Sequence, residues 1–431
     1  MSQSDIVTSV SPPSPYIQRL VDPLVAEYLA GLPAIMLVGP RATGKTTTAI
    51  RSGASVLRLD RLSSAAPVRA DPDAALSAYD EPVVIDEWQL VPEILGAVKR
   101  AVDEDSRPGR YILTGSSAAD LTSVGWPATG RVVRVPVWGL TQRELVGDVG
   151  IRPFISRLFD GSLVHIGLPA HVPGLRDYVE LALRGAFPEV VNQPSERLRR
   201  AWLSSYIDQI VARDIALAGP SRDPVRLRRY LQAVAANTAG SPEHKTLYEA
   251  AELNRLTALA YDDVLQSLLV VEHLPAWASS RLGQLSGTPK RHIIDPGLLG
   301  PLLGLDLRSV LRSADLLGRV IDSFVTAQLR AELAVCDEAP RMFHLRESHG
   351  RHEIDLILES SDGRVVALEF KADASPPASA AQHLRWMRDR IGDRFAFGAV
   401  MHSGPLPYMI DERIAALPIC SIWGPDHRSP R

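Results

Sequence analysis

The chain has 431 residues, 45% of them hydrophobic and 23% charged, and a formal net charge of −3 at pH 7. This length predicts roughly two to four domains, and the composition is typical of a soluble globular protein. The small net charge excludes a general electrostatic attraction to nucleic acid or to an anionic membrane, so any basic surface must be local.

Cysteine usage and the N-terminus predict the compartment. The two cysteines, Cys336 and Cys420, stand in no metal-ligand spacing, and so few cysteines are typical of a reducing environment. Residues 1–15 lack the basic and apolar regions of a signal peptide, and no run of about 18 apolar residues could form a transmembrane helix. We therefore expect a cytoplasmic protein that has no membrane partner and begins with a flexible tail.

Residues 16–145 alternate between helical and strand patterns. After helical spacing at 16–31, continuous apolar runs typical of buried parallel strands follow at 34–38, 55–60, 82–86, 110–115 and 131–137. Strands that alternate with helices predict an α/β fold with a parallel sheet covered on both faces.

The rest of the chain is predicted in three parts. Residues 146–240 indicate a helical linker or lid region. Its arginine-rich stretch, 195–230, is either a solvated face or a contact for nucleic acid, nucleotide or a neighbouring subunit. Residues 241–300 indicate a helix-turn-helix and a small hairpin, which together are winged-helix-like. Residues 315–425 predict a final domain that contains a helix, a hairpin, a second helix and a strand.

The stretch GPRATGKT, residues 39–46, matches the phosphate-binding pattern G-x-x-x-x-G-K-[ST] after a predicted strand. Its glycines let successive backbone N–H groups face phosphate oxygens, while Lys45 reaches the β- and γ-phosphates and Thr46 holds Mg²⁺. We expect ATP and Mg²⁺ as ligands. The residues expected to contact the nucleotide here are Gly39, Pro40, Arg41, Ala42, Thr43, Gly44, Lys45, Thr46 and Thr47.

An acidic pair follows at the end of the 82–86 strand. Asp86 is expected to help hold Mg²⁺, and Glu87 to polarise the attacking water. Such a pair after a complete phosphate-binding loop predicts an ATPase and not merely a nucleotide-binding protein.

Three further residues are candidates for nucleotide contact. Thr114 or Ser116 could sense the γ-phosphate, although hydroxyl residues at a strand end also serve as simple caps. Arg131 could act in trans as an arginine finger if the subunits form a ring, or be an ordinary surface residue. A second copy of the chain is therefore a candidate partner beside ATP.

Several stretches occur in an order that resembles a known family. They are LVGPRATGKTT, VLRLDR, ADPDAAL, VVIDEWQLVPEIL, YILTGSS, ALRGAFPEVV, YIDQIVARDI, HIIDPGLLG and the ending EIDLILE…VVALEFKA. Over roughly residues 16–400 the chain resembles prokaryotic AAA-type P-loop ATPases that end in a winged helix and a PD-(D/E)XK-nuclease-like domain of unknown function. The resemblance implies ATP binding and ATPase activity, and it makes DNA a candidate partner by association alone. The chain departs from the family at Trp88, where a smaller apolar residue is usual, and at Asp322, where glutamate is usual.

The second helix of the predicted helix-turn-helix, 257–270, does not suit DNA. It carries Asp262 and Asp263 and no lysine or arginine, and carboxylates would repel the phosphate backbone. We therefore expect a structural or inter-domain role for this helix.

The stretch 352–372 predicts a hairpin. A three-residue turn with Gly363 in the left-handed position pairs Ser360 with Arg364 and sets Asp355 opposite Glu369. Period-two alternation gives a core face of Ile354, Leu356, Leu358, Val366, Leu368 and Phe370, and a polar face of Glu353, Asp355, Glu369 and Lys371.

Two carboxylates directly opposite each other need an offsetting charge, which a divalent cation would supply. The resemblance implies a metal at Asp322, Asp355 and Glu369, and a DNA-cleaving centre whose catalytic residues are Asp355, Glu369 and Lys371. Two alternatives stay open. The hairpin could be an ordinary one with its polar face in water, or the protein could be a nucleotide-gated factor that binds DNA or protein through an inactive nuclease-like domain.

Overall fold

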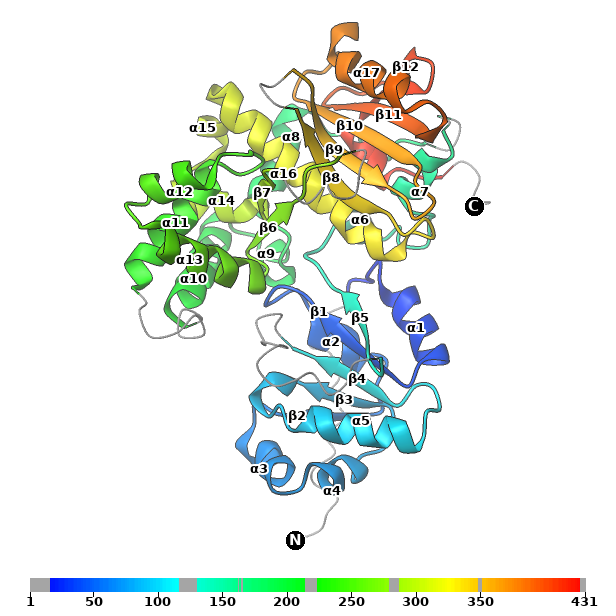
Figure 1. The fold of residues 1–431 in the computed structure, drawn as a ribbon, viewed down its shortest axis with the longest axis vertical. Helices are drawn as coiled ribbons and strands as arrows, with labels where there is room; N and C mark the ends of the chain where they lie inside the picture. The colour runs from blue at the N-terminus through cyan, green and yellow to red at the C-terminus, as the bar shows by residue number, and fades with distance from the viewer. Residues whose placement is uncertain are drawn as a thin grey trace. The chain divides into compact units, whose positions relative to one another are not determined.

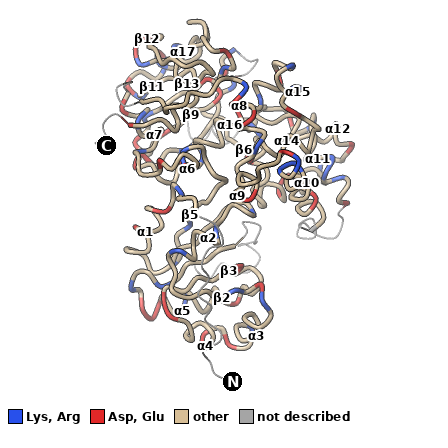
Figure 2. The backbone as a smooth tube through the Cα atoms, turned by 180° about the vertical axis from the view of Figure 1, so that it is seen from behind, with Lys and Arg blue, Asp and Glu red and all other residues tan. Residues whose placement is uncertain are grey.

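The computed structural model describes residues 16–115, 130–161, 163, 166–213, 223–278, 287–347 and 351–426. The predicted tail at 1–15 and Ser116 lie outside these residues. The chain forms two compact units, which we call unit 1 (1–140 with 267–269) and unit 2 (141–266 with 270–431). Figure 2 shows acidic and basic residues interspersed along both units, in line with the small net charge.

Unit 1 is a five-stranded sheet with the order β2-β3-β4-β1-β5, and every neighbouring pair is parallel (Figure 1). Its strands are β1 (Ala34–Val38), β2 (Ser55–Arg58), β3 (Val83–Asp86), β4 (Tyr111–Thr114) and β5 (Val133–Pro136). Its helices are α1 (Asp22–Gly31), α2 (Lys45–Ile50), α3 (Leu62–Ala70), α4 (Pro72–Ser77) and α5 (Ile94–Glu104). The predicted α/β fold with a parallel sheet is confirmed.

The central strands of the unit 1 sheet, β1, β3 and β4, are buried on both faces, whereas Val133 and Arg134 of the edge strand β5 are exposed. Val83 and Ile85 of β3 belong to a core cluster with residues of α3 and α5, and Val84 between them is also fully buried. Burial on both faces explains why the strands appear in the sequence as continuous apolar runs. Because all five strands are parallel, their carboxyl ends share one edge of the sheet. The loops that follow β1, β3 and β4 therefore meet there.

Unit 2 begins with helices that pack on a later, long helix. The elements up to the small sheet are α6 (Gln142–Val146), α7 (Phe154–Phe159), α8 (Leu175–Arg184), α9 (Pro188–Val191), α10 (Glu196–Arg213), α11 (Pro224–Ala236), α12 (His244–Ala250) and α13 (Arg255–Ser267). Arg143 of α6 forms a buried ion pair of 2.6 Å with Glu332 of α16 (Ala314–Glu332). This pair explains why the chain enters unit 2 at 141, four residues before the predicted domain end at 145.

The middle of unit 2 brings together the stretches ALRGAFPEVV and HIIDPGLLG, which both belong to the family resemblance. Strands β6 (Val271–Leu274) and β7 (Lys290–Ile293) form an antiparallel pair, followed by α14 (Leu299–Leu303) and α15 (Leu307–Arg312). The carboxylate of Asp295, in HIIDPGLLG, accepts hydrogen bonds of 2.8 Å from the backbone N–H groups of Ala186, in ALRGAFPEVV, and of Gly297. Burial raises the pKa of Asp295 to about 6. Helices α12 and α13 and this hairpin lie where the sequence places them, and their identity as a winged helix stays a prediction.

The last part of unit 2 is a six-stranded mixed sheet with the order β12-β13-β11-β10-β9-β8 (Figure 1). Its strands are β8 (Arg341–Arg346), β9 (Glu353–Glu359), β10 (Val365–Lys371), β11 (Phe395–His402), β12 (Tyr408–Asp411) and β13 (Ile414–Pro418). Helix α17 (Gln382–Ile391) packs on β9, β10 and β11, and α16 packs on β10.

The β9–β10 hairpin has the predicted register. Val365 pairs with Glu359 and Leu368 with Leu356, so the next pair in the ladder is Glu369 with Asp355. Gly363 has φ +85°, as the three-residue turn requires.

The face that carries the four predicted polar residues is buried along the rest of the hairpin. Ile357, Val365 and Ala367 alternate with the core residues, yet they are fully buried in a cluster with Leu384 and Met387 of α17. The sheet is thus covered on both faces, because β10 is a central strand with a parallel neighbour and a helix above it. The charged residues Asp355, Glu369 and Lys371 lie at the open end of the hairpin, away from the turn.

The structure describes the two cysteines and the lengths of the helices. Cys336 and Cys420 are both buried free thiols, so they form no disulfide. Within the described residues, no helix has the length and apolar character needed to cross a bilayer.

Candidate functional site

The phosphate-binding loop lies between β1 and α2, at the carboxyl edge of the unit 1 sheet. A Cβ on Gly39 would lie 2.0 Å from the carbonyl oxygen of Val137, so only glycine fits. Gly44 has φ +91° and caps the helix that begins at Lys45. Thr43 closes the loop from inside, since its hydroxyl donates to the carbonyl of Pro40 at 2.9 Å. These contacts explain the residue types of the motif.

Lys45 is buried inside the loop, with 7% of its surface exposed. Its ammonium donates to the carbonyl oxygens of Gly39 at 3.0 Å and Pro40 at 2.6 Å. Burial lowers the pKa of Lys45 to about 8, while the negative charges of Glu87 and Asp86 act in the opposite direction. A desolvated ammonium in a loop of backbone amides is suited to phosphate oxygens.

Asp86 links the loop to the neighbouring strand. Its Oδ1 accepts a hydrogen bond of 2.7 Å from the Thr46 hydroxyl and another from the hydroxyl of Thr114, its partner in the β3–β4 ladder. Asp86 and Thr114 are both buried. The Thr46 hydroxyl and the Asp86 carboxylate are hard oxygen donors within hydrogen-bonding reach of each other, which is a donor set that Mg²⁺ accepts.

Glu87 occupies a strained backbone position. Its φ of 56° lies in the left-handed region, which costs a non-glycine residue about 1–3 kcal/mol. The side-chain amide of Gln89 donates to its carboxylate. Trp88, the departure from the family pattern, turns into the buried core and approaches Gly115, so it leaves the acidic pair in place.

Of the remaining residues predicted to contact the nucleotide, some lie on the loop or on α2, and Arg131 lies before β5. Ala42 and Thr47 are exposed on the loop and on α2, and the positive charge of Arg41 lowers the pKa of Lys45. Arg131 precedes β5 and therefore lies at the opposite edge of the sheet from the loop of its own chain. It forms an ion pair of 2.8 Å with Asp103. Its role in trans, and the assembly that this role requires, stay predictions.

Sequence reasoning missed residues of the N-terminal segment that contact the loop and the helix α2 that follows it. Arg19 is buried and donates to the carbonyl of Thr43 at 2.7 Å. The Arg51 guanidinium lies over the ring of Tyr16, 4.3 Å from the ring centre. The Tyr16 hydroxyl donates a hydrogen bond of 2.7 Å to the Asp22 carboxylate. No local pattern marks these residues, because segments far apart in the sequence supply the two sides of the contacts.

The charged end of the β9–β10 hairpin gathers three predicted residues of unit 2. Lys371 forms an ion pair of 3.1 Å with Glu369, and Asp355 accepts a hydrogen bond of 2.9 Å from the backbone N–H of Phe370. Glu369 is 4% exposed, and its Oε1 has no hydrogen-bond partner among the described residues. Burial and the charge of Asp355 raise the pKa of Glu369 well above its usual range.

A lysine that sequence analysis did not single out enters the same cluster. Lys290 of β7 is 5% exposed; its ammonium pairs with the Asp322 carboxylate and donates to the carbonyl of Asp355 at 3.0 Å. Burial opposes its charge, but the two carboxylates more than offset this and raise its pKa. Burial also raises the pKa of Asp322 to about 7.

The metal-binding role expected for Asp322, Asp355 and Glu369 stays a prediction. Throughout the described ranges, no three His, Cys, Asp or Glu side chains lie close enough to hold a metal ion. The Lys290 ammonium lies between two of the carboxylates. It forms an ion pair with Asp322 and lies 3.5 Å from the carboxylate of Asp355. The Lys290 ammonium therefore supplies a positive charge beside two of these carboxylates.

Comparison with known proteins places the chain. An AAA domain model matches residues 32–146, and two domains of unknown function, DUF8612 and DUF4143, match residues 175–309 and 317–422. Two uncharacterized proteins, from Mycobacterium tuberculosis (strain ATCC 25618 / H37Rv) and Mycobacterium bovis (strain ATCC BAA-935 / AF2122/97), are each 30% identical to this chain over 397 residues. The alignment covers 90% of this chain and 80% of each relative. The chain belongs to the family of these mycobacterial proteins.

The match at residues 32–146 shows that the N-terminal part of the chain is an AAA-type P-loop domain. Domains of this class bind and hydrolyse ATP. The solved Walker-type ATPase of Pyrococcus abyssi aligns with a TM-score of 0.43 and 15% identity, over 68% of this chain and 99% of that one. The identity of the C-terminal domain as nuclease-like rests on the resemblance and on the hairpin residues alone.

Helix α13 differs from the expectation about DNA in two respects. It begins at Arg255, two residues before the predicted start at 257, so it does carry an arginine. The second respect concerns its acidic pair. Asp262 is buried and accepts a hydrogen bond of 3.1 Å from the Tyr230 hydroxyl. The Nε2 of His273 lies 3.1 Å from the Asp262 carboxylate. Of the acidic pair only Asp263 is exposed. One carboxylate is thus part of the internal packing and cannot repel a DNA backbone by direct contact.

Proposed function

We propose that the protein is a Mg²⁺-dependent ATPase whose hydrolytic centre consists of the phosphate-binding loop, Asp86 and Glu87. The observation that carries this proposal is the meeting of three groups at one edge of the sheet. The buried Lys45 ammonium lies inside the loop, the Thr46 hydroxyl bonds to Asp86, and the Glu87 carboxylate is close enough to act on the pKa of Lys45.

Each residue has a distinct part in phosphoryl transfer. The backbone amides of the loop orient the phosphates, and Lys45 stabilises negative charge on the β- and γ-phosphate oxygens. Thr46 and Asp86 would hold Mg²⁺, which supplies further neutralisation of that charge. Glu87 accepts the proton of the attacking water, and Thr114 holds the Asp86 carboxylate in position.

Replacing Lys45 with alanine should weaken ATP binding about 10- to 100-fold, because a charge-assisted hydrogen bond contributes about 1.5–3 kcal/mol and each 1.4 kcal/mol is a factor of ten. Equilibrium titration with a fluorescent ATP analogue measures this change. Lys99→Ala is the matched control, because Lys99 is a partly exposed lysine of the same unit that pairs with Asp103. Equal affinity in Lys45→Ala and wild type would remove Lys45 from the site.

The hairpin cluster supports a second candidate, a metal-dependent DNA nuclease centred on Asp355, Glu369 and Lys371. In its favour are the side-by-side placement of these residues and the unpartnered, buried Oε1 of Glu369. Against it stands Lys290, whose ammonium already neutralises part of the cluster. The alternative is a nuclease-like domain that only binds DNA or protein.

DNA cleavage in Mg²⁺ or Mn²⁺, with and without ATP, separates these alternatives. If the cluster is a nuclease, wild type should cut DNA, Asp355→Ala should lose cleavage, and ATP should change the rate if the nucleotide state is coupled to unit 2. Glu353→Ala is the control, because Glu353 is an exposed carboxylate of the same strand. No cleavage by wild type, or equal cleavage by Asp355→Ala, excludes the nuclease for the DNA tested.

A further inference from the structure

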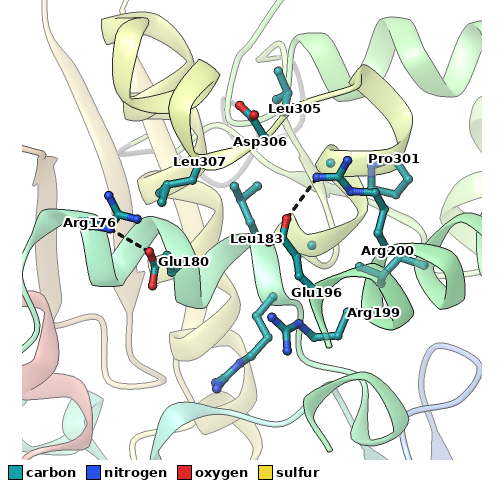
Figure 3. Close-up of a pocket in the computed structure, with 14 residues that line it drawn as sticks. Arg176, Glu180, Leu183, Glu196, Arg199, Arg200, Pro301, Leu305, Asp306 and Leu307 are labelled. Atoms are coloured by element: carbon teal, nitrogen blue, oxygen red, sulfur yellow. Dashed lines mark hydrogen bonds and ion pairs between the residues drawn. The ribbon is translucent and has the colours of Figure 1, made fainter. Parts of the chain in front are cut away.

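Unit 2 contains a pocket of about 310 Å³ between α8, α10 and the segment that leads into α15 (Figure 3). Leu183, Leu203 and Leu307 contribute apolar surface to its walls. Four arginines line it: Arg176 and Arg184 from α8, and Arg199 and Arg200 from α10. The volume is within the range of small-molecule sites, and the polar groups are concentrated in guanidinium donors.

Two of these arginines are neutralised by acids on their own helices. Arg176 pairs with Glu180 at 2.9 Å, and Arg200 pairs with Glu196 at 3.2 Å, as the dashed lines in Figure 3 show. The third acidic residue of the pocket, Asp306, caps α15 by accepting a hydrogen bond of 2.8 Å from the backbone N–H of Ser309. The acids of the pocket therefore already have partners.

Arg184 and Arg199 differ from the other two. Within the described residues neither forms an ion pair with a carboxylate. Arg199 donates to the carbonyl of Gln193 at 2.8 Å, and Arg184 has a long contact of 3.4 Å to the side chain of Gln142. The Nε of Arg184 is buried and has no hydrogen-bond partner in the part of the chain that the structure describes.

The two guanidiniums also repel each other. Burial lowers the pKa of Arg184, and the positive charge of Arg199 lowers it further. Two like charges held together without a counter-ion are unfavourable, and a bound anion would offset the repulsion. A guanidinium presents a planar fork of N–H donors that matches phosphate oxygens, so a phosphoryl group suits this pair.

We propose that this pocket binds the phosphoryl group of a small phosphorylated molecule through Arg184 and Arg199, with the leucines in contact with the rest of the ligand. The site lies in unit 2 and uses no residue of the phosphate-binding loop, so it is independent of the ATPase proposal.

A small ligand fits better than nucleic acid. Outside the pocket, arginines of the same stretch pair with carboxylates, as Arg228 does with Asp208 and Arg229 with Glu252 at 2.6 Å. Around α10 and α11 acidic residues are mixed with the arginines, as Figure 2 shows. These ion pairs reduce the positive charge available to a polyanion along the described part of the stretch. A compact phosphate monoester needs only the guanidiniums of Arg184 and Arg199, which have no carboxylate partner among the described residues.

Isothermal titration of the full chain tests the proposal. The chain carries Lys45→Ala, which weakens the nucleotide site, and the probes are inorganic phosphate, glycerol 3-phosphate and a single-stranded oligonucleotide. We expect both small phosphates to bind. Arg184→Gln and Arg199→Gln should each weaken that binding about tenfold or more, because each removes charge-assisted hydrogen bonds. Free phosphate and a monoester are distinguished by which of them binds more tightly.

Arg197→Gln is the matched control, because Arg197 is an exposed arginine of the same helix that does not line the pocket. Its phosphate affinity should equal that of the parent chain. Circular dichroism checks folding, and if Arg184→Gln unfolds, the Arg199→Gln result decides. The proposal is overturned if neither small phosphate binds, if Arg197→Gln weakens binding as much as Arg199→Gln, or if only the oligonucleotide binds.

Discussion

ATP turnover should fall about 10²- to 10⁴-fold when Glu87 is replaced by glutamine, because this is the usual contribution of a positioned general base. Glutamine has the same size and can accept the left-handed backbone about as well, so the loop should keep its shape. ATP should still bind, since Lys45, Thr46 and Asp86 are unchanged. Steady-state phosphate release measures the turnover, and equilibrium titration measures the binding.

The Glu87 variant has a matched control in unit 1. Glu93 is exposed at the start of α5, and Glu93→Gln should turn over ATP at the wild-type rate. The variant should also bind ATP less well at high pH than wild type, because the Glu87 charge helps to keep Lys45 protonated. Unchanged turnover in Glu87→Gln would show that another group accepts the proton.

Removing the Lys290 ammonium should destabilise unit 2 by about 3–5 kcal/mol, which is the usual cost of leaving a buried charge without its partner. Lys290 is 5% exposed and lies between the carboxylates of Asp322 and Asp355. Lys290→Ala removes both the charge and the packed side chain, whereas Lys290→Met keeps most of the volume. If the charge is what matters, both variants should lose most of this stability in urea unfolding at neutral pH.

The control for Lys290 is an exposed lysine of the same unit. Lys245 pairs with Glu249 at 3.6 Å on a solvent-facing helix, and Lys245→Ala should change the free energy of unfolding by less than about 1 kcal/mol. Recovery of wild-type stability in Lys290→Met would show that packing, and not the ion pairs, accounts for the effect. Wild-type stability in Lys290→Ala would mean that the cluster has no need of the ammonium.

Some features follow from the sequence because nearby residues determine them. The phosphate-binding loop needs glycine at 44, where the backbone has a φ of +91° before the helix begins, and the strand before the loop is a continuous apolar run. The hairpin register follows from the turn at Gly363, which alone places Asp355 opposite Glu369. Local spacing was sufficient in each case.

Other features depend on residues that only the tertiary structure brings together. Alternation left open an ordinary hairpin with one face in water, but α17 covers Ile357 and Ala367 on that face, and no pattern within the hairpin reveals that helix. The acidic Asp262 looked exposed in the sequence, yet it bonds inward to Tyr230 of another helix.

The sequence by itself therefore determined the nucleotide loop, its acidic pair and the order of charges along the hairpin, because each depends on backbone geometry over a few residues. Only the tertiary structure decided what faces those charges. Lys290 arrives from β7 beside Asp322 and Asp355, and Arg184 and Arg199 meet across two helices. The electrostatic state of a buried group depends on every charge packed around it, and distance along the chain does not reveal those neighbours.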